Sequence, residues 1–334
     1  MLRRIRVLLL LPVLAAALAA CSSSGDAITL YSGRSEAQVK PILVEFTKAT
    51  GIKVKPRYGA SAEMAAQIAE EGSRTRADVF WAQDAGALSS VDGHGLFGPV
   101  PADALASVEK RFQADDGNWI GISGRARVIV YNSKKLQPAD LPTSVFQLTD
   151  PKWKGRIGIA PTNGSFQAFL TAMRLQVGEA RTRDWLNGLK ANEPKTFEDN
   201  ALVVRAVNEG QIDVGLVNHY YLFQLTAEIG ADKVVARNHF TAAGDPGSLV
   251  NVAGVGIIKN TKKAADAATF VEYLLSSEAQ HHFAERNFEY PLIKGVSPVN
   301  GLVPLDQVRG PDLDLSNLGD LEHTLDLLRQ VGLL

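Results

Sequence analysis

The sequence contains a single cysteine, Cys21, among 334 residues, and it carries no excess of charge of either sign. One cysteine excludes an internal disulfide framework and any zinc or iron–sulfur site built from several cysteines. The 35 Lys and Arg residues nearly balance the 36 Asp and Glu residues, so the chain lacks the basic surplus that neutralises phosphates, and we expect no nucleic-acid partner. Catalytic signatures are missing too, since no G-x-S-x-G, H-E-x-x-H or phosphate-loop segment occurs.

Long apolar runs are equally scarce, and the one clear case is Val7–Leu18 near the start, preceded by three arginines. A charged start, a short apolar stretch and small residues predict an export signal over residues 1–20. Cys21 directly follows Leu18-Ala19-Ala20, which resembles the lipobox of bacterial lipoproteins, although an ordinary signal with an unmodified cysteine has the same outline. We therefore expect a lipidated Cys21, a tether over residues 21–26, and an exported protein anchored to the outer face of the cell membrane or in the periplasm.

Apolar periodicity behind the signal predicts alternating strands and helices, and 46% hydrophobic residues suffice for packed cores. Two α/β units are connected by two long extended segments, Trp119–Tyr131 and Leu249–Ile258, and one long helix is expected over Lys262–Arg286. The predicted fold class is α/β, with two lobes that each hold a mostly parallel sheet flanked by helices and that are joined by two extended hinge strands. We expect the first lobe to comprise residues 27–124 and about 248–295, and the second lobe residues 125–247 and about 296–334.

Ligands of open α/β sheets bind beyond the carboxyl ends of the strands, so the loops at those ends are the candidate site. The loop Asn163-Gly164-Ser165 suits a helix N-terminus, which either holds an anion or is simply capped. Arg125 and Arg127 lie two apart and share one side of an extended segment, where they either fix an anion or form ordinary solvated or ion-paired contacts.

The consecutive phenols of Tyr220 and Tyr221 follow a predicted strand and are the sharpest chemical signal. Adjacent tyrosines are often core residues. At a strand end beside a cleft, however, phenolate oxygens are hard donors that suit a hard trivalent cation. A helix N-terminus would favour the phenolate form through its partial positive charge.

The whole mature length resembles the ferric-iron-binding subclass of ABC-transporter solute-binding proteins, which have the two-lobed periplasmic-binding-protein fold. The resemblance rests on the order and spacing of these segments: Tyr31-Ser-Gly-Arg, Phe46-Thr-Lys-Ala-Thr-Gly-Ile-Lys-Val, Glu71-Gly-Ser-Arg, Ala77-Asp-Val-Phe, Ser123-Gly-Arg-Ala-Arg-Val, Pro151-Lys-Trp-Lys-Gly-Arg-Ile-Gly, Ala160-Pro-Thr-Asn-Gly, Gly215-Leu-Val-Asn-His-Tyr-Tyr and Gly244-Asp-Pro-Gly. It implies that paired tyrosines bind Fe³⁺ and that a synergistic anion, such as carbonate, phosphate or citrate, completes the coordination.

Carried over position by position, the resemblance assigns the metal to Tyr220 and Tyr221. It assigns the anion to a set of polar residues: Asn163, Gly164, Ser165, Asn200, Asn218 and Arg125, with Arg127 as the alternative to Arg125.

Two departures from the family pattern bear on the first lobe. Many members have a histidine and a glutamate where this chain has Ser35 and Gln83, and others have a third tyrosine in the place of Ser165. We therefore expect Ser35, Gln83 and Asp84 to be weak metal donors or to stand behind the metal ligands. The site should then depend on an anion, or bind a small iron chelate.

The resemblance also implies a transport role, in which the protein is a binding receptor and not an enzyme. Its partners would be the permease and ATPase subunits of an ABC importer, the membrane through the lipid anchor, and no second copy, since we expect a monomer. Two alternatives remain open: a receptor of the same fold for a phosphonate, polyamine, thiamine-like compound or oxyanion, and an exported hydrolase.

Overall fold

The computed structural model describes residues 27–299 and 301–334. The predicted signal segment, the predicted lipidation of Cys21 and the tether over residues 21–26 lie outside the described residues. Within the described part of the chain, no helix combines the length and the apolar character that crossing a membrane requires.

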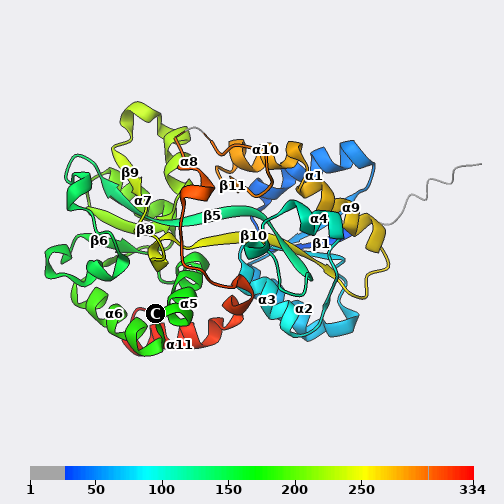
Figure 1. Cartoon of the computed structure of the whole chain (residues 1–334), viewed down its shortest axis with the longest axis horizontal. Helices are drawn as coiled ribbons and strands as arrows, with labels where there is room; N and C mark the ends of the chain where they lie inside the picture. Colours follow the sequence, from blue (N-terminus) through cyan, green and yellow to red (C-terminus); the bar gives the residue numbers. More distant parts are fainter. Residues whose placement is uncertain (1–26, 300) are drawn as a thin grey trace, which may run out of the picture.

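Helices and strands alternate along most of the chain (Figure 1). The strands are β1 (Ile28–Ser32), β2 (Val54–Tyr58), β3 (Val79–Ala82), β4 (Phe97–Gly98), β5 (Trp119–Asn132), β6 (Ile157–Ile159), β7 (Lys195–Thr196), β8 (Val214–Asn218), β9 (Ala236–His239), β10 (Val250–Ile258) and β11 (Tyr290–Pro291). The helices are α1 (Glu36–Thr50), α2 (Ser61–Glu71), α3 (Ala85–Gly93), α4 (Ala102–Ser107), α5 (Gly164–Val177), α6 (Glu179–Ala191), α7 (Asn200–Asn208), α8 (Tyr220–Ile229), α9 (Ala264–Leu274), α10 (Ser277–Arg286) and α11 (Leu321–Val331).

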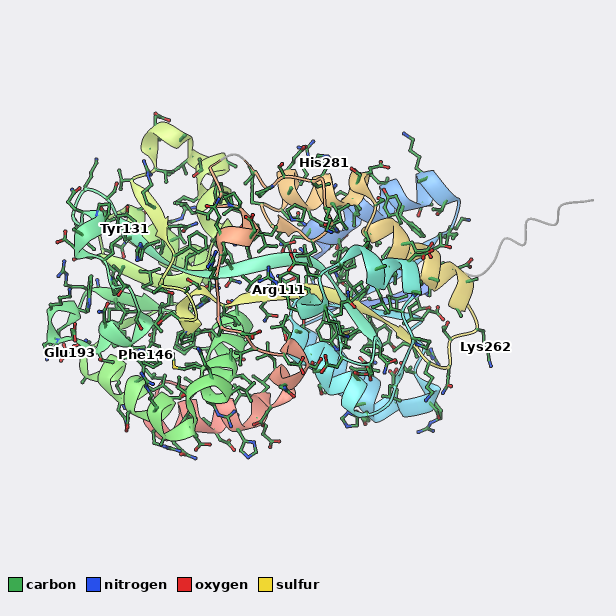
Figure 2. The ribbon with its side chains drawn as sticks, in the orientation of Figure 1. Arg111, Tyr131, Phe146, Glu193, Lys262 and His281 are labelled. Atoms are coloured by element: carbon green, nitrogen blue, oxygen red, sulfur yellow. The ribbon has the colours of Figure 1, made fainter. Side chains whose placement is uncertain are left out.

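The long strand β5 belongs to both lobes and joins their sheets. In the first lobe the order is β2-β1-β3-β10-β5, with β1 parallel to its neighbours and β10 antiparallel. The far end of β5 pairs with β8 of the second lobe, and β8 runs parallel to β6. Figure 1 shows β5 and β10 crossing from one half of the molecule to the other. The predicted two-lobed α/β fold is confirmed. Figure 2 shows side chains throughout both halves of the molecule, with Glu193 and Lys262 at opposite ends.

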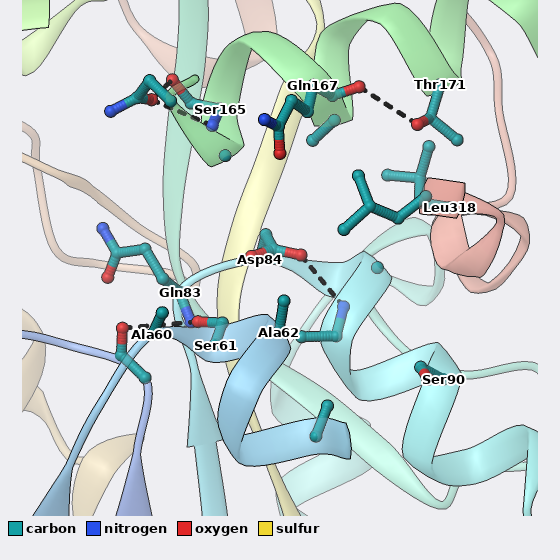
Figure 3. A pocket seen from close by; sticks show the side chains of 18 of the residues that line it. Ala60, Ser61, Ala62, Gln83, Asp84, Ser90, Ser165, Gln167, Thr171 and Leu318 are labelled. Carbon is teal, nitrogen blue, oxygen red and sulfur yellow. Dashed lines mark hydrogen bonds between the residues drawn. The ribbon is translucent and has the colours of Figure 1, made fainter. Parts of the chain in front are cut away.

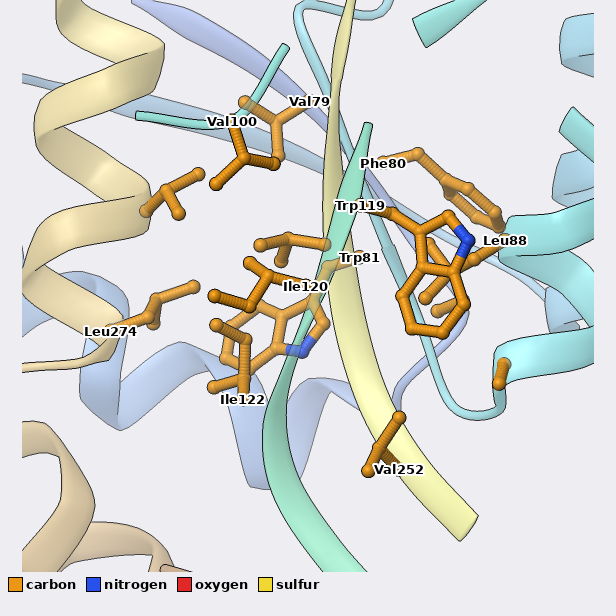
Figure 4. Packing of buried hydrophobic residues seen from close by; sticks show 14 of the residues in the cluster. Val79, Phe80, Trp81, Leu88, Val100, Trp119, Ile120, Ile122, Val252 and Leu274 are labelled. Atoms are coloured by element: carbon orange, nitrogen blue, oxygen red, sulfur yellow. The ribbon is translucent and has the colours of Figure 1, made fainter. Parts of the chain in front are cut away.

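Each lobe has its own apolar core. In the first lobe, Trp81 lies edge-on to Phe270 and to Phe283. Figure 4 shows Trp81 and Trp119 on opposite sides of the crossing strands, with Leu88 beside Trp119. The second lobe has separate clusters on the two faces of its sheet. Two independent cores connected by strands allow the lobes to move as rigid bodies about a hinge.

The single helix expected over Lys262–Arg286 is wrong, because the segment forms α9 and α10. Ser276 between them has an extended backbone, and its hydroxyl accepts a hydrogen bond from the Ala279 N–H. A serine in this conformation starts a new helix, so the chain turns although its apolar face continues.

The C-terminal segment departs from the expected boundary near residue 296. Leu302, Val308, Leu315 and Leu318 belong to the core of the first lobe, whereas α11 packs on α5 and α6 of the second lobe. The reason is the apolar spacing of this stretch, which places its leucines against the first lobe before α11 crosses over. The segment is therefore a further connection between the lobes, in addition to β5 and β10.

Asp213 provides a pH-dependent contribution to the stability of the second lobe. Its carboxylate accepts hydrogen bonds from Arg156 Nε at 2.6 Å and Lys135 Nζ at 2.8 Å. Burial alone would raise the pKa of Asp213, but these two cations outweigh it and lower the pKa below its usual range. Because the pKa of Asp213 is lower in the folded protein than in the unfolded chain, where it is near ~3.9, the ionised carboxylate stabilises the fold at pH values above ~3.9. This stabilisation is lost as the pH falls through the lower pKa of the folded state.

We expect Asp213→Asn to reduce the free energy of unfolding by about 1 kcal/mol at neutral pH. The difference from the wild type should narrow as the pH falls below about 4, where the wild-type carboxyl takes up its proton. Urea unfolding of both proteins across this pH range measures the effect. The matched control is Asp326→Asn, which removes an exposed pair with Arg329 and should change little. A constant gap between Asp213→Asn and wild type at all pH values would contradict the assignment.

Candidate metal centre

A cavity of about 680 Å³ lies between the two lobes. Its walls come from the carboxyl ends of the strands in both lobes and from the C-terminal segment, as Figure 3 shows for α2, α3, α5 and Leu318. Eight of the residues singled out in the sequence line it: Gln83, Asp84, Arg125, Asn163, Gly164, Ser165, Tyr220 and Tyr221.

Gln83 and Asp84 form the polar part of the first-lobe wall, directly after β3. The Gln83 N–H donates to Ser61 Oγ at 2.8 Å, and Asp84 caps α3 by accepting from the Ala87 N–H at 3.0 Å. Burial raises the pKa of the Asp84 carboxyl, against the opposing effects of this backbone N–H and of Arg125. Gln83 Oε1 is buried and has no hydrogen-bond partner among the described residues. Both side chains are therefore available to a ligand, but neither is a strong anionic donor.

Ser35 is not in the cavity wall, contrary to the expectation that it contributes from the first lobe. It is exposed at the start of α1, and its hydroxyl donates to Gln38 Oε1. The neighbouring Arg34 turns inward instead and forms a fully buried ion pair with Glu289 at 2.9 Å. Because Arg34 anchors the loop, Ser35 is carried to the outer surface.

The two tyrosines lie where β8 ends and α8 begins, at the second-lobe wall. Their rings stack with centroids 4.3 Å apart and planes at 28°. Tyr220 is only 3% exposed, and burial raises the pKa of its phenol well above the usual value, against the lowering effect of Arg125. The first turn of a helix carries a partial positive charge, which favours the phenolate form. The arrangement places two neighbouring tyrosine side chains at one cavity, at a position suited to anionic donors.

His219, immediately before the tyrosines, is fully buried and has both ring nitrogens occupied. Nδ1 accepts from the Ala126 N–H at 3.1 Å, so Nε2 carries the proton and donates to Phe288 O at 2.8 Å. Burial lowers the pKa of His219 to about 4, which keeps the imidazole neutral. His219 therefore fixes the start of α8 against β5 and the segment before β11.

The loop before α5 also belongs to the second-lobe wall, and its side chains form hydrogen bonds with one another and with Asn200. Asn163 caps the helix by accepting from the Ser165 N–H, and the Ser165 hydroxyl also donates to Asn163 Oδ1. Asn200 donates to both side chains from behind, and it is fully buried. Asn163 therefore caps α5, and Gly164 and Ser165 line the cavity as well. Asn200 supports this loop and does not line the cavity.

The two arginines of β5 have different surroundings although both are buried. Arg125 lines the cavity, and its Nε has no hydrogen-bond partner among the described residues. Arg127 lies behind the wall, where it donates to Leu216 O and to Ser165 Oγ and approaches Asn218 Oδ1. Asn218 is therefore directed toward Arg127, and neither it nor Arg127 lines the cavity. Within the described residues, neither arginine has a carboxylate oxygen within 4.0 Å.

Sequence reasoning missed the contribution of the C-terminal segment to the cavity. Leu318, Leu325, Glu322 and Arg329 line it beside α3 and α5. Their pattern indicates only an amphipathic helix, and no local signal indicates that the segment returns to the cleft.

The available donor set is short for a metal ion that prefers six ligands. The described residues contain no group of three or more His, Cys, Asp or Glu side chains arranged to hold a metal. Two phenols and the carboxyls of Asp84 and Glu322 are the oxygen donors that can become anionic at this cavity. Such a set suits a hard cation, with the remaining positions left to a bound anion or chelator.

Comparison with known proteins gives one family match and many full-length relatives. Residues 74–312 match the family model described as bacterial extracellular solute-binding protein. The major ferric iron-binding protein of Neisseria meningitidis serogroup B is 36% identical over 323 residues, which cover 96% of this chain and 97% of that protein.

Solved structures show the same similarity. Iron-bound HitA from Pseudomonas aeruginosa has a TM-score of 0.86 at 37% identity and covers 92% of this chain and 99% of its own. The Trichodesmium protein IdiA (FutA), in complex with iron and citrate ligands, has a TM-score of 0.81 at 32% identity, with coverage of 92% and 99%.

Proposed function

Because the chain belongs to the bacterial extracellular solute-binding proteins, we propose that it captures ferric iron in the cavity between its lobes. The iron would be held together with a small synergistic anion or enter as a small ferric chelate. Relatives named as ferric iron-binding proteins support this assignment, and so do solved structures with bound iron. Their sequence identity to this chain is higher than that of distant relatives, which would support only a shared fold.

The observation that carries the proposal is the pair of stacked phenols at the start of α8. Tyr220 and Tyr221 supply two oxygens of one kind at one wall of the cavity. Binding of a trivalent cation displaces the phenol protons, because metal ligands must be deprotonated. Phenolate is a hard donor and Fe³⁺ a hard acceptor, and the chain offers no cluster of softer ligands among the described residues.

Charge balance supports an accompanying anion. Two phenolates neutralise two of the three charges of Fe³⁺, and the buried Arg125 at the wall adds a further positive charge. The loop of Gly164 and Ser165 and the free Nε of Arg125 are the groups that would receive a carbonate, phosphate or carboxylate. Asp84 would contribute the remaining negative charge from the first lobe.

The family membership implies an exported protein that works with an ABC transporter. We propose further that the protein is a monomer anchored through a lipid on Cys21 and that it delivers iron to the permease and ATPase subunits. The relatives are named as binding proteins, and we propose binding without catalysis for this chain as well.

Iron loading of the purified protein tests the function. We expect Fe³⁺ with bicarbonate, phosphate or citrate to give a visible phenolate-to-iron charge-transfer band that persists through desalting. The anion that gives the most stable colour identifies the synergistic partner. Absence of the band and of retained iron with all three anions would contradict the proposed function.

A matched pair of first-lobe variants tests which residues there reach the metal site. Asp84→Asn removes a charge at the wall but keeps the cap of α3, because asparagine caps helices as well as aspartate does. We expect iron binding to weaken about ten-fold, as for loss of a polar group beside metal ligands. Ser35→Ala, outside the cavity, should leave the affinity unchanged. Competition titration against citrate measures both, and a large loss with Ser35→Ala would refute this placement.

A further inference from the structure

Basic side chains gather at the end of the first lobe that lies opposite the cavity. They belong to three segments, residues 51–53 before β2, residues 72–77 before β3 and residues 259–265 after β10. We call the five exposed cations of these segments the basal patch: Lys53, Arg74, Arg76, Lys259 and Lys262. None of the five forms a salt bridge with another described residue. Figure 2 shows Lys262 at this end of the molecule.

The pairing of the strands brings the three segments to one edge of the first-lobe sheet. The Ile28 N–H at the start of β1 donates to Lys53 O at 2.9 Å, and the Ile258 N–H at the end of β10 donates to Asp78 O, just before β3, at 3.0 Å. The parallel strands β1, β2 and β3 therefore begin at this edge, and the loops at their opposite ends line the cavity. A partner bound at the basal patch leaves the cavity uncovered.

The positive charge of the basal patch is local. Its three segments contain no Asp or Glu, whereas the chain without residues 1–20 has four more acidic than basic residues. Of the acids that directly flank the segments, Glu71 accepts from Thr75 Oγ1 at 2.6 Å and Asp78 accepts from Lys263 Nζ at 3.3 Å. The third flanking acid is Asp266 in α9. The patch is thus a positive end on a negative molecule, and it is complementary to an anionic surface.

The described chain begins at the same edge of the sheet, which limits the distance between the patch and a lipid anchor. Lys263 Nζ donates to the carbonyl oxygen of Ala27, the first described residue, at 2.8 Å. Ala27 is six residues after Cys21, and six residues span at most about 20 Å. A lipid on Cys21 would therefore hold the basal patch close to the headgroups of its own membrane.

We propose that the basal patch docks on the anionic lipid headgroups of the membrane that holds the anchor. The inference rests on the proposed lipidation of Cys21 and is independent of what binds in the cavity. Each Lys or Arg beside an anionic membrane strengthens binding about five-fold, so five weak contacts together hold the lobe on the surface. Acyl chains combined with a basic patch are a pairing that anchors proteins stably. The docked first lobe stands on the membrane, and the cavity at the far edge of its sheet stays open to its ligand.

Lysine footprinting of the mature protein tests the docking. The protein is extracted from membranes of cells that produce the full chain and is placed in vesicles of phosphatidylcholine alone or of equal parts phosphatidylcholine and phosphatidylglycerol. We expect acetylation of Lys53, Lys259 and Lys262 to be at least about five-fold slower on the anionic vesicles. Acetylation of Lys134 and Lys152, which are exposed in the second lobe, should be equal on both. High salt should remove the difference, because it screens exposed charges.

A charge-reversal variant tests whether the patch acts as a unit. Arg74→Glu combined with Arg76→Glu keeps the three lysines that report on docking, and their protection on anionic vesicles should be lost. The matched control, Arg181→Glu combined with Arg237→Glu, reverses two exposed charges of the second lobe and should keep the protection. Both variants should develop the charge-transfer band of the wild type, because all four arginines lie outside the cavity.

The outcomes separate docking from iron capture. Acetylation of the patch lysines at equal rates on both kinds of vesicle overturns the proposal, whether it is fast or is slow because copies of the chain contact each other there. A mature N-terminus without lipid on Cys21, measured by mass spectrometry, overturns it as well. Protection that survives in Arg74→Glu with Arg76→Glu also contradicts the basal patch as the docking surface. A wild-type protein that shows no charge-transfer band contradicts the iron function and leaves the docking result unaffected.

Discussion

Replacing both Tyr220 and Tyr221 with phenylalanine should abolish the charge-transfer band and the retention of Fe³⁺. The change removes two hydroxyl oxygens and keeps both rings, so the stacking at 4.3 Å can persist. Each single variant should weaken iron binding by more than about 100-fold, because loss of a direct ligand exceeds the effect of losing a supporting partner. Visible spectra and competition with citrate measure these effects.

The same experiment requires evidence that the variants fold and that the colour is specific. We expect the apo double variant to keep the wild-type far-UV circular dichroism, since phenylalanine keeps both rings, including that of Tyr221, which packs against one second-lobe cluster. Tyr131→Phe is the matched control, because Tyr131 is a partly buried tyrosine of the second lobe outside the cavity. A double variant with an unchanged iron spectrum would remove the tyrosines from the site.

The second-lobe part of the site could be predicted because its signals are local. Tyr220 and Tyr221 directly follow an apolar strand, and Asn163 precedes an apolar helix, so strand ends and helix starts were visible in the pattern. The parallel pairing of β6 with β8 then brings both ends to one edge of the sheet. Five predicted residues that follow these two strands, Asn163, Gly164, Ser165, Tyr220 and Tyr221, consequently lie around one cavity.

The first-lobe part of the site could not be predicted in this way, because it depends on contacts between residues that are far apart in the sequence. The sequence predicts that Ser35 is a weak metal donor or stands behind the metal ligands, but its loop is anchored by Arg34 on Glu289, which lies 255 positions further along the chain. No local pattern indicates this pairing. The break at Ser276 is different, because a serine after the apolar pair Leu274-Leu275 is a helix-start signal that the sequence does contain. The sequence also could not separate the roles of Arg125 and Arg127, because residues two apart on a strand lie on the same side. The structure shows that Arg125 lines the cavity and that Arg127 does not.

Glu289→Gln should cause the largest loss of stability among the substitutions considered, because it leaves a buried cation unpaired. Both carboxylate oxygens of Glu289 accept from Arg34 Nη2, at 3.0 and 2.9 Å, and one also accepts from Ser123 Oγ at 2.7 Å. Both partners of the ion pair are fully buried. Breaking a buried pair by removing one charge costs about 3–5 kcal/mol. Urea unfolding of the apo protein should show this loss.

Two comparisons make the result specific to the buried pair. Glu228→Gln removes an exposed partner of Arg205 and should cost less than about 1 kcal/mol. Arg34→Met combined with Glu289→Gln should recover part of the loss, because no uncompensated charge remains. If Glu289→Gln alone costs no more than Glu228→Gln, the pair does not hold the first lobe together as described.

The consequence for iron binding follows from the separation of the two cores. Arg34, Glu289 and Ser123 lie in the first lobe, where Arg34 also packs over Trp81 at 5.3 Å, whereas the tyrosines start a helix of the second lobe. Hydrogen exchange should therefore lose protection in β1 and β3 and keep it in β8. The folded fraction of Glu289→Gln should still develop the charge-transfer band, with an affinity reduced only as far as first-lobe closure contributes. Loss of the band in folded Glu289→Gln would show that the first lobe determines the geometry of the tyrosine pair, through the contact of His219 with Phe288 O next to Glu289.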